Sequence, residues 1–470
     1  MRRREFLARA VAAMPILGCA TQTHGQSAER PPDILLIVVD DLGWRDLGCY
    51  GGGDIFETPN IDRLASQGMR FTQAYANCPV CSPSRAALMT GKDPARLQFT
   101  GHITAIGKHR HPKGSRILPP DDRLYLPHEE ITLAEALAPG GYVSASVGKW
   151  HLGHQGYWPE NQGFDKNVAG WTHGSPPTYF DPYENPAKEW NAAIPTLADR
   201  QPGEYLTDRL TDESIAFMES HGGQPFFVYM TYYAVHTPLE APEDLVAKYN
   251  QKLAGATTGV EPAYAAMVER VDWNVGRLLA TLDRLGVSDN TVVVLFSDNG
   301  GYLGATTNAP LREGKSWLYE GGIRVPLIIK WPGEVPEGSV SHEPVIGADL
   351  FPTLVEIGGQ PLSDAADLDG ASLRPLWREG GQLPRDTLYW YYPHYGISKE
   401  PAAAVRKRDF KLIEFYDPPR TELYDLSKDL GEQHNLAEAM PEKVKELKAD
   451  LAAYLSRVGA KMHTLNPDTE

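Results

Sequence analysis

Four oxygen-bearing side chains follow two continuous apolar segments of the chain. Asp40 and Asp41 end a segment that begins at residue 33, and Asp298 and Asn299 end a segment that begins at residue 291. Grouped carboxylates repel one another unless a cation lies between them, and carboxylate and carboxamide oxygens are the ligands that Ca²⁺ and Mg²⁺ prefer. These residues therefore predict a site for a hard divalent cation. Because Asp and Asn also favour turns and caps, a purely structural role is the alternative.

A cysteine in the first hundred residues could do a second kind of chemistry. The sequence Cys81-Ser82-Pro83-Ser84-Arg85 predicts the start of a helix, with Ser82 as the N-cap and Pro83 in the first helical position. Cys81 would then lie at the positive end of the helix, a location that lowers the pKa of a thiol and attracts anions. Arg85 follows about one turn later. The alternative is a buried, apolar cysteine beside a capped helix.

The elements that must position these residues indicate an α/β fold. The two apolar segments have the pattern of buried parallel strands, and open sheets of this kind bind ligands at the carboxyl ends of their strands. Further strands are expected at residues 225–230 and 325–331. A helix is expected before the second apolar segment and ends at Gly286. Its apolar face comprises Tyr264, Met267, Val271, Val275, Leu278, Leu279 and Leu282.

From Leu388 onward the sequence changes to short aromatic and alternating segments, which predict strands at 388–392, 410–415 and 422–426. A final helix is expected to carry Val444, Leu447, Leu451, Leu455 and Val458 on one face. This texture predicts a smaller α+β domain with an antiparallel sheet. Two long inserts, residues 101–130 and 171–203, are rich in His, Pro, Tyr and Trp, and such loops usually shape a site.

The first residues of the chain resemble an export signal. Residues 1–18 combine a basic start with an apolar run that is too short to span a bilayer. Arg3-Arg4-Glu5-Phe6-Leu7 resembles a twin-arginine signal, and the segment ending in Cys19 resembles a lipobox whose cysteine is lipidated. Residues 19–32 would form a polar tether. The pattern predicts export to the periplasm or the cell surface with a lipid anchor, and an ordinary cleavage site with an incidental cysteine is the alternative.

Composition excludes several classes of protein. The chain has 470 residues, of which 42% are hydrophobic and 23% charged, values typical of a soluble globular protein rather than a membrane bundle or a disordered chain. The formal net charge of -16 disfavours a nucleic-acid partner, so an anionic ligand requires a locally basic pocket. The sequence leaves a disulfide between Cys49 and Cys78 open.

An ordered set of motifs resembles the type I sulfatases. The Cys81-x-Pro83-x-Arg85 motif continues to Leu88-Met89-Thr90-Gly91. The other matching segments are Val38-Val39-Asp40-Asp41 with Gly43, Thr58-Pro59-Asn60-Ile61-Asp62, Gly148-Lys149-Trp150-His151-Leu152-Gly153, His236-Thr237-Pro238, Ser297-Asp298-Asn299-Gly300 and Gly314-Lys315. The resemblance implies an alkaline-phosphatase-like α/β fold. Residues 33–375 would form a large mixed, mostly parallel sheet sandwiched by helices, and residues 376–470 a smaller α+β subdomain.

The resemblance also implies a cofactor and a modification. A formylglycine-generating or sulfatase-maturing enzyme would oxidise Cys81 to formylglycine, and one Ca²⁺ would be bound by formylglycine 81 together with Asp40, Asp41, Asp298 and Asn299. In the family, the hydrated aldehyde attacks sulfur and expels the alcohol, leaving a sulfate ester on the enzyme. The second hydroxyl then loses its proton and expels sulfate.

Basic side chains receive roles in the same way. Arg85, Lys149 and Lys315 would balance the charge on the sulfuryl oxygens and the departing alcohol. Lys149 and His151 are two residues apart, so in an extended segment both side chains face one side. His151 resembles the family residue that supports the nucleophile, and His236 resembles the one near the leaving group, where the alcohol must be protonated.

The candidate substrate-binding residues are His102, Arg312 and His394. His102 belongs to a basic loop that also contains Lys108, His109, Arg110, His111 and Arg116. Side chains that could stack on or hydrogen-bond a sugar are Trp171, His173, Tyr179, Trp190 and Tyr395. Export and anchoring favour a sulfated saccharide as substrate. Two alternatives stay open: a phosphodiesterase or phosphonate monoester hydrolase of the same fold, and a non-catalytic surface lipoprotein that binds sulfated glycans.

Overall fold

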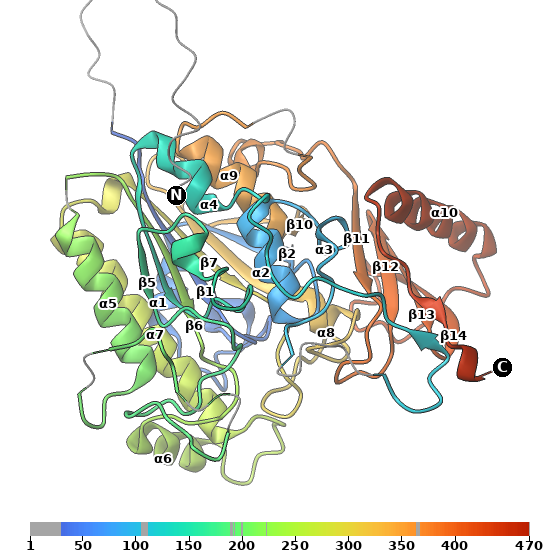
Figure 1. Cartoon of the computed structure of the whole chain (residues 1–470), viewed down its shortest axis with the longest axis horizontal. Coiled ribbons are helices and arrows are strands. Elements are labelled where there is room, and N and C mark those ends of the chain that lie inside the picture. The colour runs from blue at the N-terminus through green and yellow to red at the C-terminus, as the bar shows by residue number, and fades with distance from the viewer. Residues whose placement is uncertain are drawn as a thin grey trace, which may run out of the picture. The chain divides into compact units, whose positions relative to one another are not determined.

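Strand β1 (Asp33–Val39) lies inside a large sheet whose strands run mostly parallel (Figure 1). It pairs in parallel with β6 (Phe226–Tyr232) on one side and with β7 (Thr291–Ser297) on the other. All residues of these three strands are buried. Burial on both faces explains why each strand has a continuous apolar sequence, and the prediction of two buried parallel strands is confirmed.

The computed structural model describes residues 30–104, 111–188, 191, 193–198, 201–221, 223–362 and 367–469. Within these residues the sheet has nine strands. Their order is β10 (Val345–Ile346), β2 (Met69–Tyr75), β8 (Arg324–Lys330), β7, β1, β6, β4 (Val143–Gly148) and β5 (Lys166–Val168), with β9 (Ser339–Ser341) paired to β2. Because β8 runs antiparallel to both β2 and β7, the sheet is mixed, as the resemblance implied.

Helices cover both faces of this sheet. Leu35 and Ile37 of β1 belong to one core, with residues of α1, α5 and α7, whereas Leu36 and Val38 belong to the other core, with residues of α2, α4 and α9. The helix predicted before Gly286 is α7. The helix bounds are α1 (Pro59–Ser66), α2 (Cys81–Thr90), α3 (Pro94–Leu97), α4 (Leu133–Leu137), α5 (Leu206–Ser220), α6 (Glu243–Lys252), α7 (Pro262–Arg284), α8 (Glu320–Ile323), α9 (Leu350–Ile357) and α10 (Pro441–Arg457).

A four-stranded antiparallel sheet follows near the C-terminus. It comprises β11 (Thr387–Tyr392), β12 (Ala402–Lys407), β13 (Phe410–Tyr416) and β14 (Pro419–Asp425), and α10 packs on one of its faces. The predicted strands and the final helix are confirmed, but the sequence indicated no strand at β12. Its Ala-Ala-Ala-Val-Arg-Lys sequence has little strand propensity, and the strand exists because β11 and β13 pair with it on both sides.

The C-terminal sheet packs against the rest of residues Pro31–Glu470, which form one compact unit. Trp390 and Ile413 share a core with Tyr75 and Ile346, and β15 (Thr464–Leu465) pairs with β3 (Ile117–Leu118) of the first insert. The predicted boundary between residues 375 and 376 stays a prediction.

A buried ion-pair network joins the two sheets. The ammonium of Lys411 on β13 is fully buried and lies 2.9 Å from a carboxylate oxygen of Glu320 on α8 and 2.9 Å from one of Glu432. Glu320 also accepts hydrogen bonds from Arg324 Nε at 2.7 Å and from the Tyr75 hydroxyl at 2.8 Å. Removal of the ammonium would leave two buried carboxylates short of positive charge.

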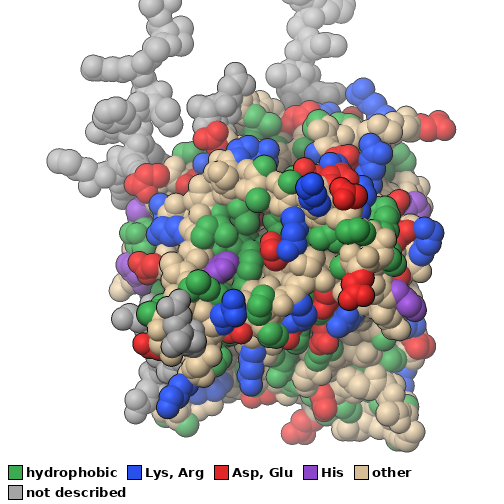
Figure 2. All heavy atoms as spheres, turned by 90° about the vertical axis from the view of Figure 1, so that its right-hand side faces the viewer, with side chains coloured by type: hydrophobic (Ala, Val, Ile, Leu, Met, Phe, Trp, Pro, Cys, Tyr) green, Lys and Arg blue, Asp and Glu red, His purple; other side chains and the backbone are tan. Residues whose placement is uncertain are grey.

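We predict that Lys411→Met lowers the free energy of unfolding by about 3–5 kcal/mol, because it breaks a buried ion pair from one side. The matched control is Lys443→Met on α10, whose ion pair with Glu446 is partly exposed. Acidic and basic side chains lie side by side on the face of the molecule that Figure 2 shows. Urea unfolding of both variants measures the difference. Equal destabilisation by the two substitutions would contradict the structural role of Lys411.

Candidate active site

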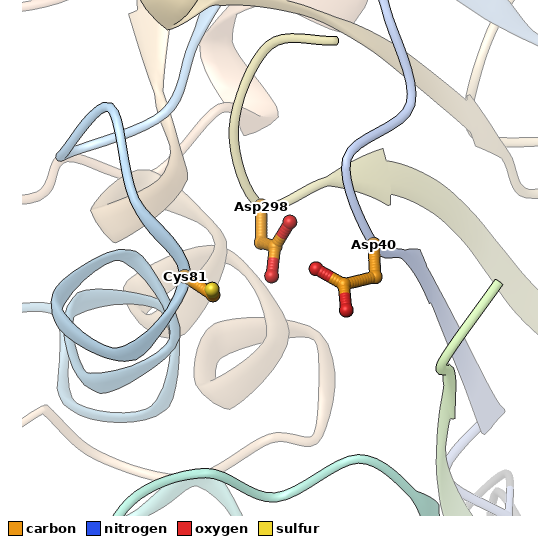
Figure 3. Close-up of side chains that lie close together, drawn as sticks. All are labelled: Asp40, Cys81 and Asp298. Atoms are coloured by element: carbon orange, nitrogen blue, oxygen red, sulfur yellow. The ribbon is translucent and has the colours of Figure 1, made fainter. Parts of the chain in front are cut away.

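The carboxyl ends of β1 and β7 bring the predicted acidic residues together. Asp40 follows β1 and Asp298 follows β7, and Val39 and Ser297 are paired in the register of the two strands. The carboxylates of Asp40 and Asp298 point toward one another, and Cys81 Sγ points toward them from the start of α2 (Figure 3). One ligand atom from each of these three residues lies within 4.8 Å of the other two.

Each carboxylate of this cluster contacts a basic side chain. Lys149 Nζ lies 2.6 Å from Asp40 Oδ2, and Arg85 Nε lies 2.7 Å from Asp298 Oδ2. Lys315 Nζ lies 2.6 Å and 2.7 Å from the two carboxylate oxygens of Asp41. The structure thus brings the three predicted cationic residues to the predicted acidic residues in a buried environment.

Two buried oxygens of the cluster have no hydrogen-bond partner among the described residues, namely Asp40 Oδ1 and Asn299 Oδ1. Asn299 Nδ2 donates to Asp41 Oδ1 at 2.7 Å and to the carbonyl of Gly300, and these bonds fix the orientation of its amide. Burial, together with the carboxylates of Asp298 and Asp41, raises the pKa of Asp40 to about 8 against the opposing charge of Lys149. Unpartnered oxygens among clustered carboxylates fit a hard divalent cation.

Cys81 is the first residue of α2, and Val80 is the N-cap. The prediction of Ser82 as N-cap is wrong: Ser82 Oγ instead accepts a hydrogen bond from the backbone N–H of Ile103 at 3.1 Å. The expectation of a lowered thiol pKa is also wrong. Complete burial raises the pKa of Cys81 and outweighs the ammonium groups of Lys149 and Lys315.

His151 is held in a confined, buried position. Its backbone is left-handed, with φ of 59°, so the expectation of an extended segment from Lys149 to His151 is wrong. Nε2 lies 3.2 Å from the carbonyl oxygen of Ile103, and Nδ1 has no hydrogen-bond partner among the described residues. Burial, and then the nearby Lys149 ammonium, holds the pKa of His151 well below its ordinary value, so the imidazole is neutral.

His236 lies beside Asp41 of the acidic cluster and is partly exposed. Its Nε2 is 3.7 Å from Asp41 Oδ2, and its Nδ1 is 2.8 Å from the carbonyl oxygen of Thr237. Burial and the Lys315 ammonium lower the pKa of His236 to about 3. When Nδ1 donates to that carbonyl, Nε2 is the nitrogen left to exchange a proton.

The three candidate substrate-binding residues differ in their surroundings. His102 lies near enough to His151 to lower its pKa. His394 is buried, with Nε2 2.8 Å from Thr100 Oγ1. The Arg312 guanidinium stacks on Tyr319 and donates to the Tyr424 hydroxyl and to the carbonyl of Glu432, so these contacts tie it to the C-terminal sheet.

Other sequence expectations have mixed outcomes. Tyr179 is fully buried and its hydroxyl lies within 2.8 Å of the backbone carbonyls of Tyr233 and His236, so it supports the His236 loop and cannot stack on a sugar. Cys49 and Cys78 are free thiols, so no disulfide joins them. The expectations that lie outside the described residues concern the signal peptide, Cys19, Lys108, His109, Arg110 and Trp190.

The sequence reasoning missed two contributors to the site. Thr231 accepts a hydrogen bond from Arg85 Nη1 at 2.7 Å and itself donates to the Lys149 carbonyl; a hydroxyl inside the apolar segment 226–232 was the available signal. Gly174 packs directly on His151, because a Cβ there would lie 2.4 Å from both Cε1 and Nδ1 of the imidazole. Nothing in the local sequence marks this glycine.

Comparison with known proteins identifies the family. The model of the family described as Sulfatase matches residues 32–359, and the model described as N-sulphoglucosamine sulphohydrolase, C-terminal, matches residues 313–461. The chain belongs to the sulfatase family. The protein is therefore a sulfuric ester hydrolase, and its large mixed sheet with flanking helices is the alkaline-phosphatase-like fold of this family. Sulfatases generally use formylglycine and a metal ion, and the cluster of Asp40, Cys81 and Asp298 is a candidate metal site.

Several relatives of this sulfatase span most of its length. A sulfatase of Formosa agariphila is 34% identical over 91% of this chain and 88% of its own. Human arylsulfatase A is 33% identical over 90% and 88%, and mouse N-acetylgalactosamine-6-sulfatase is 37% identical over 77% and 69%. The crystal structure of Ps i-CgsB in complex with k-i-k-neocarrahexaose matches with a TM-score of 0.78 and 30% identity, covering 91% of this chain and 93% of that one.

We predict that Gly174→Ala lowers kcat on nitrophenyl sulfate by about 100-fold, because the added methyl displaces the His151 imidazole and small misplacements at a reacting centre have effects of this size. The control is Gly223→Ala, whose Cβ meets open space. Steady-state kinetics and thermal melting of both variants provide the measurement. Wild-type turnover in Gly174→Ala would show that the position of His151 is unimportant.

Proposed function

We propose that this sulfatase removes sulfate from a saccharide, with residue 81 acting as formylglycine and one Ca²⁺ bound by Asp40, Asp41, Asp298 and Asn299. The observation that carries the proposal is the position of Cys81. It lies at the N-terminus of α2, within 4.8 Å of two carboxylates and beside Lys149 and Lys315. The oxygen-only donor set of the four metal-binding residues favours Ca²⁺ over softer metals.

When present, formylglycine 81 would supply a hydrated aldehyde as the oxygen nucleophile, and Ca²⁺ would supply a cation that polarises the sulfuryl oxygens. The chain's own residues do the rest. Arg85, Lys149 and Lys315 neutralise the charge that develops on the sulfuryl group. His151, held neutral by burial, has the unpartnered Nδ1 that can accept a proton on the nucleophile side. His236 is the proposed acid for the departing alcohol. Because Nδ1 holds the proton of the neutral imidazole, the partly exposed Nε2 would first take up a proton from water and then donate it to the alcohol oxygen.

The proposed substrate is a sulfated saccharide. Mouse N-acetylgalactosamine-6-sulfatase is named for a sulfated sugar, and the Ps i-CgsB structure contains a neocarrahexaose. In this chain, His102, Arg312 and His394 are the proposed sugar contacts. Arg312 would have to exchange its contacts with the C-terminal sheet, and His394, which is buried against Thr100, would have to become accessible. The phosphonate monoester hydrolase of Agrobacterium radiobacter shares the fold with a TM-score of 0.64 and 22% identity, so relative rates on sulfate and phosphate esters belong in the test.

The proposed location is the periplasm or the cell surface. Arg3-Arg4 and Cys19 would supply twin-arginine export and a lipid anchor, and a maturing enzyme would oxidise Cys81 before export. Among the described residues, no helix has the length and apolar character to cross a membrane.

We expect the peptide containing residue 81, from protein made in its native host, to be lighter than the cysteine form by one sulfur-for-oxygen exchange and two hydrogens. Mass spectrometry tests this directly. Cys81→Ala should abolish desulfation of a saccharide panel, whereas Cys78→Ala, a second buried thiol in the same segment, should remain active. An unmodified thiol in exported protein would favour the non-catalytic binding protein, and faster cleavage of phosphate esters would favour the phosphohydrolase.

We expect calcium to stabilise the folded protein. A ligand at a hundredfold excess over its Kd stabilises by about 2.7 kcal/mol, so dialysis against EGTA should lower Tm and added Ca²⁺ should restore it. Mg²⁺ should restore less, because it loses water reluctantly and requires octahedral geometry. A Tm that is indifferent to EGTA and to Ca²⁺ would contradict the calcium site.

A further inference from the structure

Asp46 is a buried carboxylate that has no role in the proposed reaction. Its Oδ2 accepts hydrogen bonds from the backbone N–H of Gly43 at 3.1 Å and from the Tyr264 hydroxyl at 2.5 Å, and its Oδ1 accepts one from Thr306 Oγ1 at 3.1 Å. The residue is 1% exposed. All three donors lie on different elements of the chain.

Two of those elements are the loops that carry the proposed calcium ligands. Gly43 lies in the loop after β1, two residues beyond Asp41, and Thr306 lies in the loop after β7, which begins with Asp298 and Asn299. The third donor, Tyr264, is on α7, and its hydroxyl also lies 3.3 Å from the Asp41 carbonyl oxygen. Asp46 therefore connects both ligand loops to α7, which packs on one face of the main sheet.

The two loops need such a connection because they touch and because one of them is strained. Asp41 has φ of 60°, a left-handed conformation that is uncommon for residues other than glycine. A Cβ on Gly301 would lie 3.2 Å from the Cα of Gly43, and a Cβ on Gly43 would lie 2.5 Å from Asp46 Oδ2. The loops are thus packed backbone against backbone around the Asp46 carboxylate.

We infer that Asp46 is a positioning residue for the metal site, because it fixes the spacing of the loop that carries Asp40 and Asp41 relative to the loop that carries Asp298 and Asn299. This inference rests on the proposed calcium site. Groups that orient metal ligands from behind influence metal affinity by about 10- to 100-fold. The affinity for Ca²⁺, rather than stability alone, should therefore depend on Asp46.

Asp46→Asn tests the inference, since the amide keeps the size of the side chain but replaces one acceptor oxygen with a donor. The matched control is Asp272→Asn. Asp272 is also a buried carboxylate with three hydrogen bonds, which it accepts from Ile61 N at 2.7 Å and from Asn60 N and Nδ2 at 3.2 Å and 2.8 Å. It ties α7 to α1, which carries no proposed ligand. Thr306→Val is a milder second variant that removes one donor to Asp46.

Calorimetric titration of the EGTA-treated proteins with Ca²⁺, below the melting transition of every variant, provides the readout. We expect Asp46→Asn to weaken Ca²⁺ binding by about 10- to 100-fold and Thr306→Val to weaken it less, while Asp272→Asn lowers Tm but keeps the wild-type Kd. Wild-type Kd in Asp46→Asn and Thr306→Val would overturn the inference and leave the calcium site intact. A wild-type protein that takes up no Ca²⁺ would overturn the calcium proposal and this inference together.

Discussion

The acidic cluster at the ends of β1 and β7 places three carboxylates in a space from which water is excluded. Each buried ion loses several kcal/mol of hydration, so such a cluster survives only when opposite charges lie against it. Arg85, Lys149 and Lys315 provide those charges from three separate parts of the chain. When all three carboxylates are ionised, the three basic side chains balance them, and a bound divalent cation would leave a net positive charge that favours an anionic sulfate ester.

This charge balance explains much of the surrounding architecture. Arg85 reaches Asp298 only because α2 starts immediately beside the sheet, and its Nη1 is held by Thr231 and by the Lys149 carbonyl. One guanidinium thus joins β6, β7 and the segment after β4. Burial of the cluster strengthens its electrostatic interactions. The same burial keeps His151 neutral and raises the pKa of the Cys81 thiol. An unmodified cysteine at this position would therefore be a poor nucleophile at neutral pH.

Buried groups of opposite charge also join the C-terminal sheet to the main sheet. Lys411 of β13 lies between Glu320 and Glu432 with complete burial, and Arg406 of β12 contacts the Tyr75 hydroxyl of the main sheet. The mutual attraction of these groups requires both sheets to be in place. The loop after β11 also approaches the active site, where the N–H of Ile397 donates to Ser316 Oγ beside Lys315. The second sheet therefore supports one wall of the site as well as the fold.

Local patterns in the sequence are enough to predict several of the elements. Continuous apolar segments gave β1 and β7, helical spacing gave α7, and the ordered motifs gave the family and the residues that meet in the cluster. Other features arise from contacts between distant parts of the chain. The strand at Ala402–Lys407 depends on its two neighbours, and the His151 imidazole has room only because Gly174 packs against it without a side chain. Asp46 and Thr231 gain their roles from partners distant in the chain. Hydrogen bonds, burial and pKa values depend on which atoms are in contact in the folded protein. These contacts join residues that are far apart in the sequence, so no local pattern predicts them.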